Sequence, residues 1–387
     1  MKKEKIVLGM SGGVDSSVAA VLLQKKGFEV YGIFMKNWDD KNAICSAEDD
    51  YADALSVCNQ LNIPLKKINY TKEYKERVFS QFLDDHQNGF TPNPDVLCNK
   101  EIKFDVFQKY AKEIGAIKIA SGHYAKIVSE DDKFFIGKAA DRSKDQSYFL
   151  YQLKSSLLMN IELPLGELLK KDIRKIAEEN NLVNASKKDS TGICFIGDRK
   201  YNDFVGQFLQ DKKGKIITVE GENIGEHNGH MYFTVGQRKG LGIGARSSAY
   251  DEPWYVVNKD INKNIVFVAQ GADHRALFSN KLLADKMHWN LDISKLLPLK
   301  CKAKVRYRDV DHSCQILSSN EDECYIKFDH AIKAITTGQS IVLYNENDIC
   351  IGGGIIRKRN IPYLGCLLYT SDAADEDDSV DLGGRGI

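Results

Sequence analysis

Between residue 5 and about residue 120, short apolar runs alternate with longer segments whose apolar positions recur at helical spacing. This alternation is typical of βαβ units, in which consecutive strands pair in parallel and helices cover the sheet. The pattern therefore predicts an α/β domain built on a parallel sheet. The expected strands and helices, in chain order, are Lys5–Leu8, Ser16–Lys26, Glu29–Phe34, Ala47–Leu61, Leu65–Asn69, Tyr74–Asp85, Phe104–Ala111, Ile117–Ala120 and Gly166–Asn180.

Beyond about residue 213 the pattern changes to short strands separated by Gly, Asn and Asp turns. Many short strands with turn signals between them are typical of small β-barrels, and we expect one or two of these. The expected strands are Lys215–Val219, Met231–Val235, Trp254–Val257, Asn264–Val268, Cys301–Tyr307, Glu323–Phe328 and Ser340–Tyr344.

These patterns divide the chain into three predicted domains and a tail. We expect the α/β domain over residues 1–212, a central β-rich domain over 213–275 and a C-terminal β-barrel domain over 276–362. Turn residues and a charged cluster at Gly271–Asn280 favour the second boundary. The tail, residues 366–387, holds six acidic residues and one basic residue and resembles a translated sequencing adapter. We therefore expect it to be artefactual or disordered, outside the folded domains.

The amino-acid composition is typical of a globular protein with no membrane-spanning segment. Of 387 residues 43% are hydrophobic, enough for a large core. No stretch approaches the roughly 20 apolar residues that cross a bilayer, and Met1–Lys5 leads directly into a predicted strand. We expect a cytoplasmic protein with no membrane partner, whose nine cysteines are reduced. No two cysteines have C-x-x-C spacing, so we expect no metal site. Without its tail the chain is mildly basic, which is compatible with a polyanionic partner.

A glycine-rich turn, Gly9–Ser17, joins the first predicted strand to the first predicted helix. Glycines tolerate positive φ and lack Cβ, so backbone N–H groups can converge on an anion at the positive end of the helix. The turn has neither the Gly-Lys-Ser/Thr ending of a Walker A loop nor a Gly-x-Gly-x-x-Gly fingerprint. It therefore predicts a nucleotide-phosphate site of another kind.

The pattern Ser-Gly-Gly-x-Asp-Ser-Ser in this turn resembles the pyrophosphate-binding loop of N-type ATP pyrophosphatases. Those enzymes cut ATP between its α and β phosphates and adenylate a substrate oxygen. A second glycine turn, Ser121–Tyr124, follows a strand at the sheet edge where open α/β sheets bind ligands. The expected ATP contacts are Gly9, Met10, Ser11, Gly12, Gly13, Val14, Asp15, Ser16, Met35 and Gly122.

Two cysteines stand in unusual local sequence. Cys98 follows the proline-rich segment Thr91–Asp95 in a predicted loop before a helix, and Cys194 lies in a second predicted loop flanked by glycines. A loop thiol near a helix N-terminus or near Lys100 can have a lowered pKa and be available as a thiolate. From loop context alone, a catalytic role and a structural role are equally compatible with each cysteine.

Taken together, six segments resemble the bacterial tRNA-specific 2-thiouridylases, with similarity from residue 5 to about residue 360. That family makes 2-thiouridine at the wobble position of tRNAs for Lys, Glu and Gln, and the resemblance implies this activity here. It also implies an ATP-pyrophosphatase domain followed by two β-rich domains that help to hold the tRNA. The segments are Gly9–Ser17, Asn93–Cys98, Ser121–Tyr124, Lys144–Leu150, Ser190–Gly197 and Gly236–Gly244.

The resemblance implies roles for the cysteines. Cys194 would carry sulfur as a persulfide, and Cys98 would be the nucleophile that either attacks the activated base or closes a disulfide with Cys194. Asp95 would be the general acid/base, although an Asx turn after Pro94 is an alternative explanation for it. ATP, with Mg²⁺ on its phosphates, would adenylate uracil O2 and so convert a poor leaving group into a phosphate ester.

The family pattern also implies two macromolecular partners. One is tRNA, and the other is a sulfur-donor protein, either a cysteine desulfurase or a sulfur-relay protein. The expected contacts to the target base or the tRNA are Asn93, Pro94, Asp95, His123, Lys144, Asp145, Gln146, Tyr307, Arg308 and Gln339.

The main alternative is another adenylating enzyme on the same fold, such as a tRNA lysidine synthase or an amidotransferase-type synthetase. Those enzymes need no cysteine pair, so Cys98 and Cys194 argue against them. Iron–sulfur-dependent tRNA thiolases use C-x-x-C ligands, which this chain lacks. A non-enzymatic RNA-binding protein would be favoured only by a degraded phosphate loop, and Gly9–Ser17 is intact.

Overall fold

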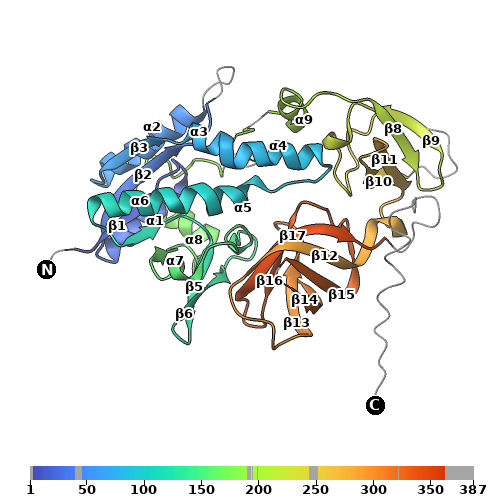
Figure 1. The fold of residues 1–387 in the computed structure, drawn as a ribbon. Coiled ribbons are helices and arrows are strands. Elements are labelled where there is room, and N and C mark those ends of the chain that lie inside the picture. Colours follow the sequence, from blue (N-terminus) through green and yellow to red (C-terminus); the bar gives the residue numbers. More distant parts are fainter. Residues whose placement is uncertain are drawn as a thin grey trace, which may run out of the picture.

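The computed structural model describes residues 3–39, 46–189, 193, 195–197, 199–243, 252–320 and 322–361. Figure 1 shows an α/β domain, a four-stranded central sheet and a closed β-barrel, in chain order. The predicted fold class is confirmed. The predicted persulfide carrier Cys194 and the predicted tail over residues 366–387 lie outside the described residues.

A five-stranded parallel sheet in the order β3-β2-β1-β4-β7 forms the centre of the α/β domain. From β1 the chain runs outward through β2 to β3 and then returns to β4 on the other side of β1. The loops after β1 and β4 therefore leave the sheet side by side, at a topological switch point where α/β sheets bind ligands. The strands are β1 (Lys5–Gly9), β2 (Glu29–Lys36), β3 (Leu65–Asn69), β4 (Lys118–Ala120) and β7 (Ile161–Glu162).

Alternate residues of β1 pack on opposite faces of the sheet. Ile6 and Leu8 join an apolar cluster with α1, α2 and α8, whereas Val7 packs in a second cluster with α4, α5 and α6. Helices on both faces explain why β1 is a continuous apolar run in the sequence. The helices are α1 (Val14–Lys25), α2 (Ser46–Gln60), α3 (Thr71–Tyr74), α4 (Ser80–Gln87), α5 (Pro94–Cys98), α6 (Phe104–Ile114), α7 (Ser155–Leu158), α8 (Lys170–Glu179) and α9 (Tyr201–Val205).

The helical segments between β3 and β4 are longer and less regular than the sequence predicts. The predicted helix Tyr74–Asp85 is part of a path from α3 through the π-helix η1 (Lys75–Phe79) to α4. A second π-helix, η2 (Asn99–Lys103), joins α5 to α6. None of the described helices has the length and apolar character needed to cross a membrane.

An antiparallel hairpin, β5 (Ala125–Glu130) and β6 (Lys133–Lys138), follows β4, and the end of β6 contacts the barrel at Ile349. The sequence analysis does not predict it. Its two-residue turn places Asp131 and Asp132 at φ 47° and 60°, the left-handed conformation that glycine or asparagine usually signals in hairpins. Aspartate also tolerates this conformation, so Asp131-Asp132 is a turn signal in the sequence that our list of expected strands does not use.

The central sheet has the order β10-β11-β8-β9. One prediction is wrong: Met231–Val235 is no strand but begins in a 3₁₀-helix, η4 (His230–Tyr232). The backbone N–H of Phe233 donates to His230 O at 3.2 Å, so a local turn replaces the expected ladder. The strands of the sheet are β8 (Gly214–Thr218), β9 (Asn223–His227), β10 (Trp254–Asp260) and β11 (Ile265–Gln270).

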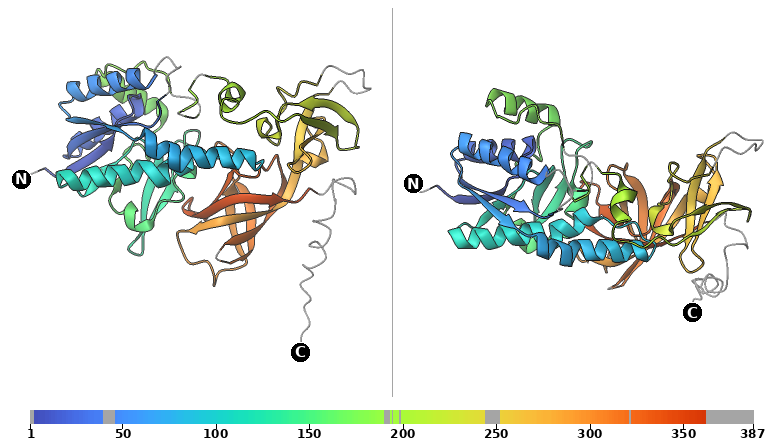
Figure 2. Two further views of the ribbon diagram at one scale, coloured as in Figure 1. Left: turned by 45° about the horizontal axis from the view of Figure 1, so that its top comes forward. Right: turned by 90° about the horizontal axis from the view of Figure 1, so that it is seen from above.

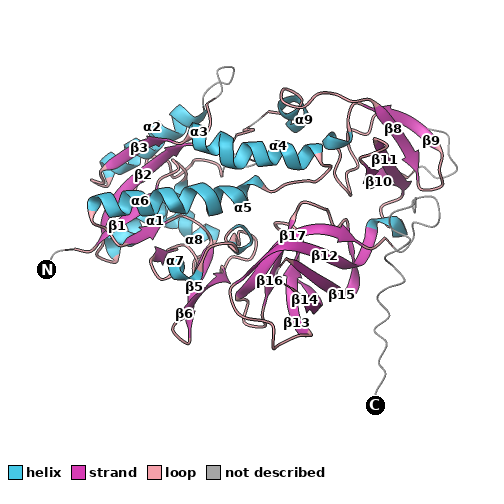
Figure 3. Cartoon of the chain, in the orientation of Figure 1, coloured by secondary structure: helices cyan, strands magenta, loops and turns pink. Residues whose placement is uncertain are grey.

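Six antiparallel strands close the C-terminal barrel in the order β12-β15-β14-β13-β16-β17. Figure 3 shows how this strand-rich part contrasts with the helix-rich α/β domain. The barrel follows a short 3₁₀-helix, η5 (Arg275–Leu277). Its strands are β12 (Phe278–Trp289), β13 (Leu299–Lys304), β14 (His312–Ser319), β15 (Glu323–Lys333), β16 (Ser340–Tyr344) and β17 (Cys350–Arg359).

The barrel docks on the α/β domain through buried polar contacts. Lys138 at the end of β6 has a side chain that is only 1% exposed, and its Nζ lies 2.7 Å from Asp311 Oδ2 and 3.1 Å from Asp348 Oδ1. Tyr148 donates to the Ser340 carbonyl at 2.8 Å. Both views in Figure 2 show the barrel beside the α/β domain. The barrel is therefore held against the segment that follows the hairpin.

Candidate active site

The loop after β1 has the geometry of a phosphate-binding turn. Gly13 is the N-cap of α1, and the Ser16 and Ser17 hydroxyls donate to its carbonyl at 3.0 Å each. Gly12 adopts φ +79°, and a Cβ there would lie 2.1 Å from the backbone oxygen of Asp50. Only glycine fits at this position, because a side chain would meet both strain and a backbone clash. The loop thus lies at the positive end of α1, and the backbone N–H groups of Ser11 and Gly13 donate to the Ser16 and Ser11 hydroxyls.

The second glycine turn packs directly on this loop. A Cβ on Gly122 would lie 3.0 Å from the backbone nitrogen of Ser16. The close approach that glycine permits is therefore to the start of α1, whereas contact of Gly122 with a nucleotide stays a prediction. Met35, at the end of β2, is half-buried and packs against the cluster that contains Val7. Its contact with adenine stays a prediction too.

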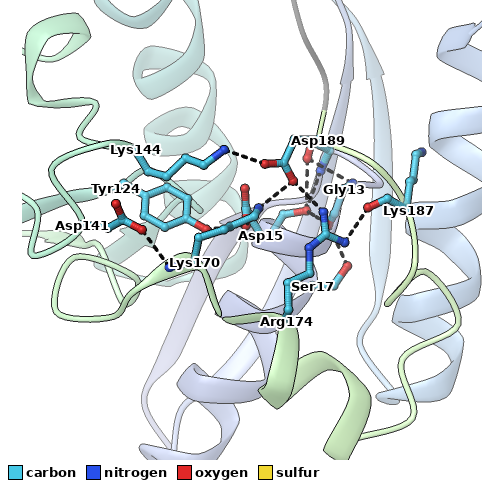
Figure 4. Close-up of polar contacts among 12 residues, drawn as sticks. Gly13, Asp15, Ser17, Tyr124, Asp141, Lys144, Lys170, Arg174, Lys187 and Asp189 are labelled. Atoms are coloured by element: carbon cyan, nitrogen blue, oxygen red, sulfur yellow. Dashed lines mark hydrogen bonds and ion pairs between the residues drawn. The ribbon is translucent and has the colours of Figure 1, made fainter. Parts of the chain in front are cut away.

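Asp15 in the first turn of α1 is at the centre of the polar contacts in Figure 4. The Tyr124 hydroxyl and Lys170 Nζ each donate to Asp15 Oδ1 at 2.6 Å. Burial, together with the hydrogen bond to Asp15, raises the pKa of Tyr124, so this hydroxyl stays protonated and donates. The two contacts tie the loops after β1 and β4 to α8.

A second carboxylate, Asp189, holds three cations beside Asp15 (Figure 4). Lys170 Nζ lies 2.8 Å and Arg174 NH2 2.7 Å from Asp189 Oδ1, and Lys144 Nζ lies 2.9 Å from Oδ2. Partial burial opposes ionisation of Asp189, but the hydrogen bonds from Lys170 and Lys144 prevail and lower its pKa to about 2. Sequence reasoning missed Lys170, Arg174 and Asp189, because no motif marks residues that lie more than 150 positions from the phosphate loop.

Cys98 lies at the end of a short helix and not in the loop that the sequence predicts. Pro94 occupies the first turn of α5, a position where its fixed φ and missing N–H are tolerated. Asp95 and Cys98 are three residues apart on this helix and so share one face. Burial raises the pKa of Cys98 and of Asp95, opposite to the lowered thiol pKa expected from sequence. The nearby Lys103 ammonium acts in the other direction on both groups.

Lys103 links this helix to the phosphate loop. It ends the π-helix η2, whose wider turns bring residues five apart onto the same side, so Cys98 and Lys103 lie close. Lys103 Nζ lies 3.5 Å from His123 Nε2, and His123 Nδ1 lies 2.8 Å from Ser121 Oγ. Burial and the Lys103 charge lower the pKa of His123, so its ring is neutral: Nε2 accepts from lysine and Nδ1 donates to serine. Cys98 and Asp95 are thus connected to the turn that covers the start of α1.

Three residues with predicted tRNA contacts, Tyr307, Arg308 and Gln339, belong to the C-terminal domain. Tyr307, half-buried just after β13, packs on Phe149 with ring centroids 4.3 Å apart, and the Arg308 guanidinium lies 5.3 Å from the Tyr307 ring. Gln339 Nε2 donates to Thr91 O at 2.8 Å, which connects the barrel to the segment that leads to Asn93 and Pro94. These residues therefore lie around the helix that carries Cys98.

The triplet Lys144, Asp145 and Gln146 has internal partners. Asp145 is 4% exposed, accepts from the backbone N–H of Ala139 at 3.0 Å and lies 3.5 Å from Lys304 Nζ in the barrel. Gln146 Oε1 accepts from the backbone N–H of Tyr124 at 3.0 Å. The structure thus gives Asp145 and Gln146 internal roles, and their tRNA contacts stay predictions. The described residues contain no group of three or more His, Cys, Asp and Glu side chains that could hold a metal ion.

Three family models match the chain in succession. The tRNA methyl transferase HUP domain covers residues 4–198, the tRNA methyl transferase PRC-barrel domain covers 202–270, and the aminomethyltransferase beta-barrel domain covers 279–356. The three matches follow the α/β domain, the central sheet and the closed barrel.

Curated relatives match along nearly their whole length. The tRNA-specific 2-thiouridylase MnmA of Legionella pneumophila (strain Lens) is 49% identical over 358 residues, which cover 92% of this chain and 99% of the relative. That of Klebsiella pneumoniae (strain 342) is 50% identical over 361 residues, with 92% and 98% covered. A U34-tRNA thiolase NcsA structure from Methanococcus maripaludis covers 53% of this chain and 63% of its own at 17% identity, with a TM-score of 0.33 that is too low to support an argument. The chain belongs to the tRNA-specific 2-thiouridylase family, whose members are tRNA sulfurtransferases.

Proposed function

We propose that this enzyme uses ATP to 2-thiolate the wobble uridine of tRNAs for Lys, Glu and Gln, by adenylation of uracil O2 and sulfur transfer from a cysteine persulfide. The names of the relatives support the tRNA substrate and the thiolation. The observation that carries the proposal is the connection of Asp95 and Cys98, through Lys103 and His123, to the turn that packs on the phosphate loop. One site can thus hold both ATP and a base.

The first step activates the base. Uracil O2 attacks the α-phosphorus of ATP, a bond forms between O2 and phosphorus, and the bond to the β-phosphate oxygen breaks to release pyrophosphate. The N–H groups after Gly9 and the positive end of α1 stabilise the charge that develops on the leaving pyrophosphate. Mg²⁺ would arrive on the phosphates, since this ion is usually bound through substrate phosphates and few protein ligands.

The second step replaces oxygen by sulfur. The terminal sulfur of a Cys194 persulfide attacks C2, and AMP leaves with the former uracil oxygen. The Cys98 thiolate then attacks the Cys194 sulfur, so a disulfide forms and the transferred sulfur stays on C2. A cellular thiol reduces the disulfide, and a cysteine desulfurase or relay protein reloads Cys194. Direct attack of Cys98 on the activated base is the other route.

The environment of Asp95 suits an acid/base role in these steps. Burial raises the pKa of Asp95, which makes its carboxylate a stronger base that can take a proton from the Cys98 thiol and return it later. Lys103 favours the thiolate that results. We expect the enzyme to work in the cytoplasm, where tRNA and ATP are available.

The test is mass spectrometry of the wobble uridine in tRNA from a strain that lacks its own 2-thiouridylase and carries this gene. The wild-type gene restores 2-thiouridine, whereas Cys98→Ser and Cys194→Ser each abolish it. Cys58→Ser serves as a control, because Cys58 is fully buried in the apolar cluster on the opposite face of the sheet. Substantial thiolation by either single variant would contradict the sulfur relay.

A further inference from the structure

Two lysines beside the phosphate loop are held by the protein's own carboxylates (Figure 4). Lys170 Nζ lies 2.6 Å from Asp15 Oδ1 and 2.8 Å from Asp189 Oδ1, and Lys144 Nζ lies 2.9 Å from Asp189 Oδ2. Within the described part of the chain, these carboxylates are the only acceptors of the two ammonium groups. The side chains of Lys170 and Lys144 are 15% and 29% exposed, so a ligand can reach them.

Arg174, the third cation on Asp189, has a different role. Its NH1 group donates to the carbonyls of Ala185 at 2.9 Å and Lys187 at 2.5 Å, while NH2 faces Asp189. These contacts fix the backbone that leads to Asp189 and do not depend on the carboxylate. Arg174 therefore positions Asp189, whereas the two lysines can exchange one anion for another.

The segment after α8 is fixed against the phosphate loop itself. Asn184 Nδ2 donates to Gly12 O at 2.9 Å and to Ser17 Oγ at 3.0 Å. The other charged groups nearby have separate partners: Asp141 accepts from the backbone N–H of Lys170, and Lys187 pairs with Asp50 and Asp53. The lysines on Asp189 therefore lie beside the start of α1, where Lys170 also contacts Asp15.

We propose that Lys144 and Lys170 form the subsite for the β- and γ-phosphates of ATP, and that Asp189 is an internal counter-anion which these phosphates displace. Phosphate and carboxylate oxygens accept the same charge-assisted hydrogen bonds from lysine, and a polyphosphate carries more negative charge than one carboxylate. The inference rests on the proposed function, since it assigns residues to the ATP used there. It gives Lys144 a nucleotide contact in place of the tRNA contact predicted from sequence.

The test compares ligands with and without the two outer phosphates. Calorimetry on the purified full chain measures the affinities of α,β-methylene-ATP with Mg²⁺ and of AMP. Lys144→Gln and Lys170→Gln each weaken binding of the analogue about ten-fold, as expected for loss of one charge-assisted contact, and leave AMP binding unchanged. Asp189→Asn strengthens analogue binding several-fold, because the competing anion is gone. Lys171→Gln, at an exposed neighbouring position of α8, changes neither affinity.

Three results would overturn the subsite. Equal loss of analogue and AMP binding in the lysine variants, or weaker analogue binding by Asp189→Asn, would mean that the cluster only holds the fold together. Lys144→Gln with reduced tRNA binding and normal analogue binding would assign Lys144 to tRNA. The lysine variants remain a test even if melting curves show that Asp189→Asn does not fold. Wild-type protein that binds no nucleotide would refute the proposed function as well, whereas the other outcomes refute the subsite alone.

Discussion

Replacement of Lys138 by methionine tests whether the barrel is held on the α/β domain by a buried ion pair. The Lys138 ammonium contacts Asp311 and Asp348 and lies 4.0 Å from the centroid of the Tyr344 ring. Asp348 also pairs with Arg142 at 2.7 Å and with Lys302 at 3.7 Å, and the substitution removes neither of these partners. Asp311 loses its only described cation, although its side chain is 35% exposed and water can reach it.

These contacts determine how much stability the Lys138→Met variant should lose. Removal of one partner from a fully buried ion pair costs about 3–5 kcal/mol, and a hydrogen bond to a charged group contributes about 1.5–3 kcal/mol. Because both carboxylates are partly exposed and Asp348 stays paired, we expect Lys138→Met to lower the free energy of unfolding by about 3 kcal/mol. Urea unfolding followed by fluorescence measures this change.

Two further variants make the measurement decisive. Lys300→Met, at an exposed position of the same barrel, should change stability by less than about 0.5 kcal/mol. Asp311→Asn should cost less in the Lys138→Met background than in the wild type, because the interaction that it removes is already lost. A loss below about 1 kcal/mol in Lys138→Met, or strictly additive effects, would refute the reasoning.

Three other predictions concern the phosphate loop and a buried histidine. Gly12→Ala should abolish pyrophosphate release and leave tRNA binding in filter assays nearly unchanged, because the new Cβ would clash with the backbone of Asp50 in α2 and so displace the phosphate loop, far from the β-rich domains. Equal loss of both activities would indicate a folding defect. Ser11→Ala should weaken ATP turnover in the same selective way, since its hydroxyl lies 3.1 Å from Ser16 Oγ within the loop. Burial lowers the pKa of His86 from 6.5 to about 3, so between pH 6.5 and about pH 3 the unfolded chain binds a proton that the folded chain does not. Stability should then fall by up to about 1.4 kcal/mol per pH unit from pH 6.5 toward pH 3, and His86→Gln should reduce that slope in urea titrations; an unchanged slope would contradict the assignment.

The sequence alone predicts an element correctly where a local pattern of residues determines its structure. Strand β1 and the loop after it follow from an apolar run that meets Gly9–Ser17, and both are in the structure. The hairpin β5-β6 is absent from the expected strands, although Asp131 and Asp132 belong to a residue type that tolerates the left-handed conformation of its turn. The prolines before Cys98 predict a loop there, although Pro94 is suited to the first turn of a helix and begins α5 in the structure.

Contacts between distant segments could not be predicted from one sequence. Lys170 reaches Asp15 only because α8 packs beside α1, and single residues of common type carry no signal of that packing. The raised pKa of Cys98 likewise depends on burial by neighbouring helices, whereas the local sequence is compatible with a thiol whose pKa is lowered. Ion-pair networks and the burial of a side chain depend on contacts that exist only after distant segments have packed together, so a single sequence does not predict them.

The central claim, that ATP activates uracil O2 before sulfur replaces it, can be tested by following one oxygen atom. A tRNA with ¹⁸O at C2 of the wobble uridine is incubated with the enzyme, ATP and a persulfide donor, and the AMP and pyrophosphate are examined by mass spectrometry. The account predicts one ¹⁸O atom in each AMP and none in pyrophosphate, with one AMP formed for each 2-thiouridine. Unlabelled AMP accompanied by 2-thiouridine, or ¹⁸O in pyrophosphate, would contradict it.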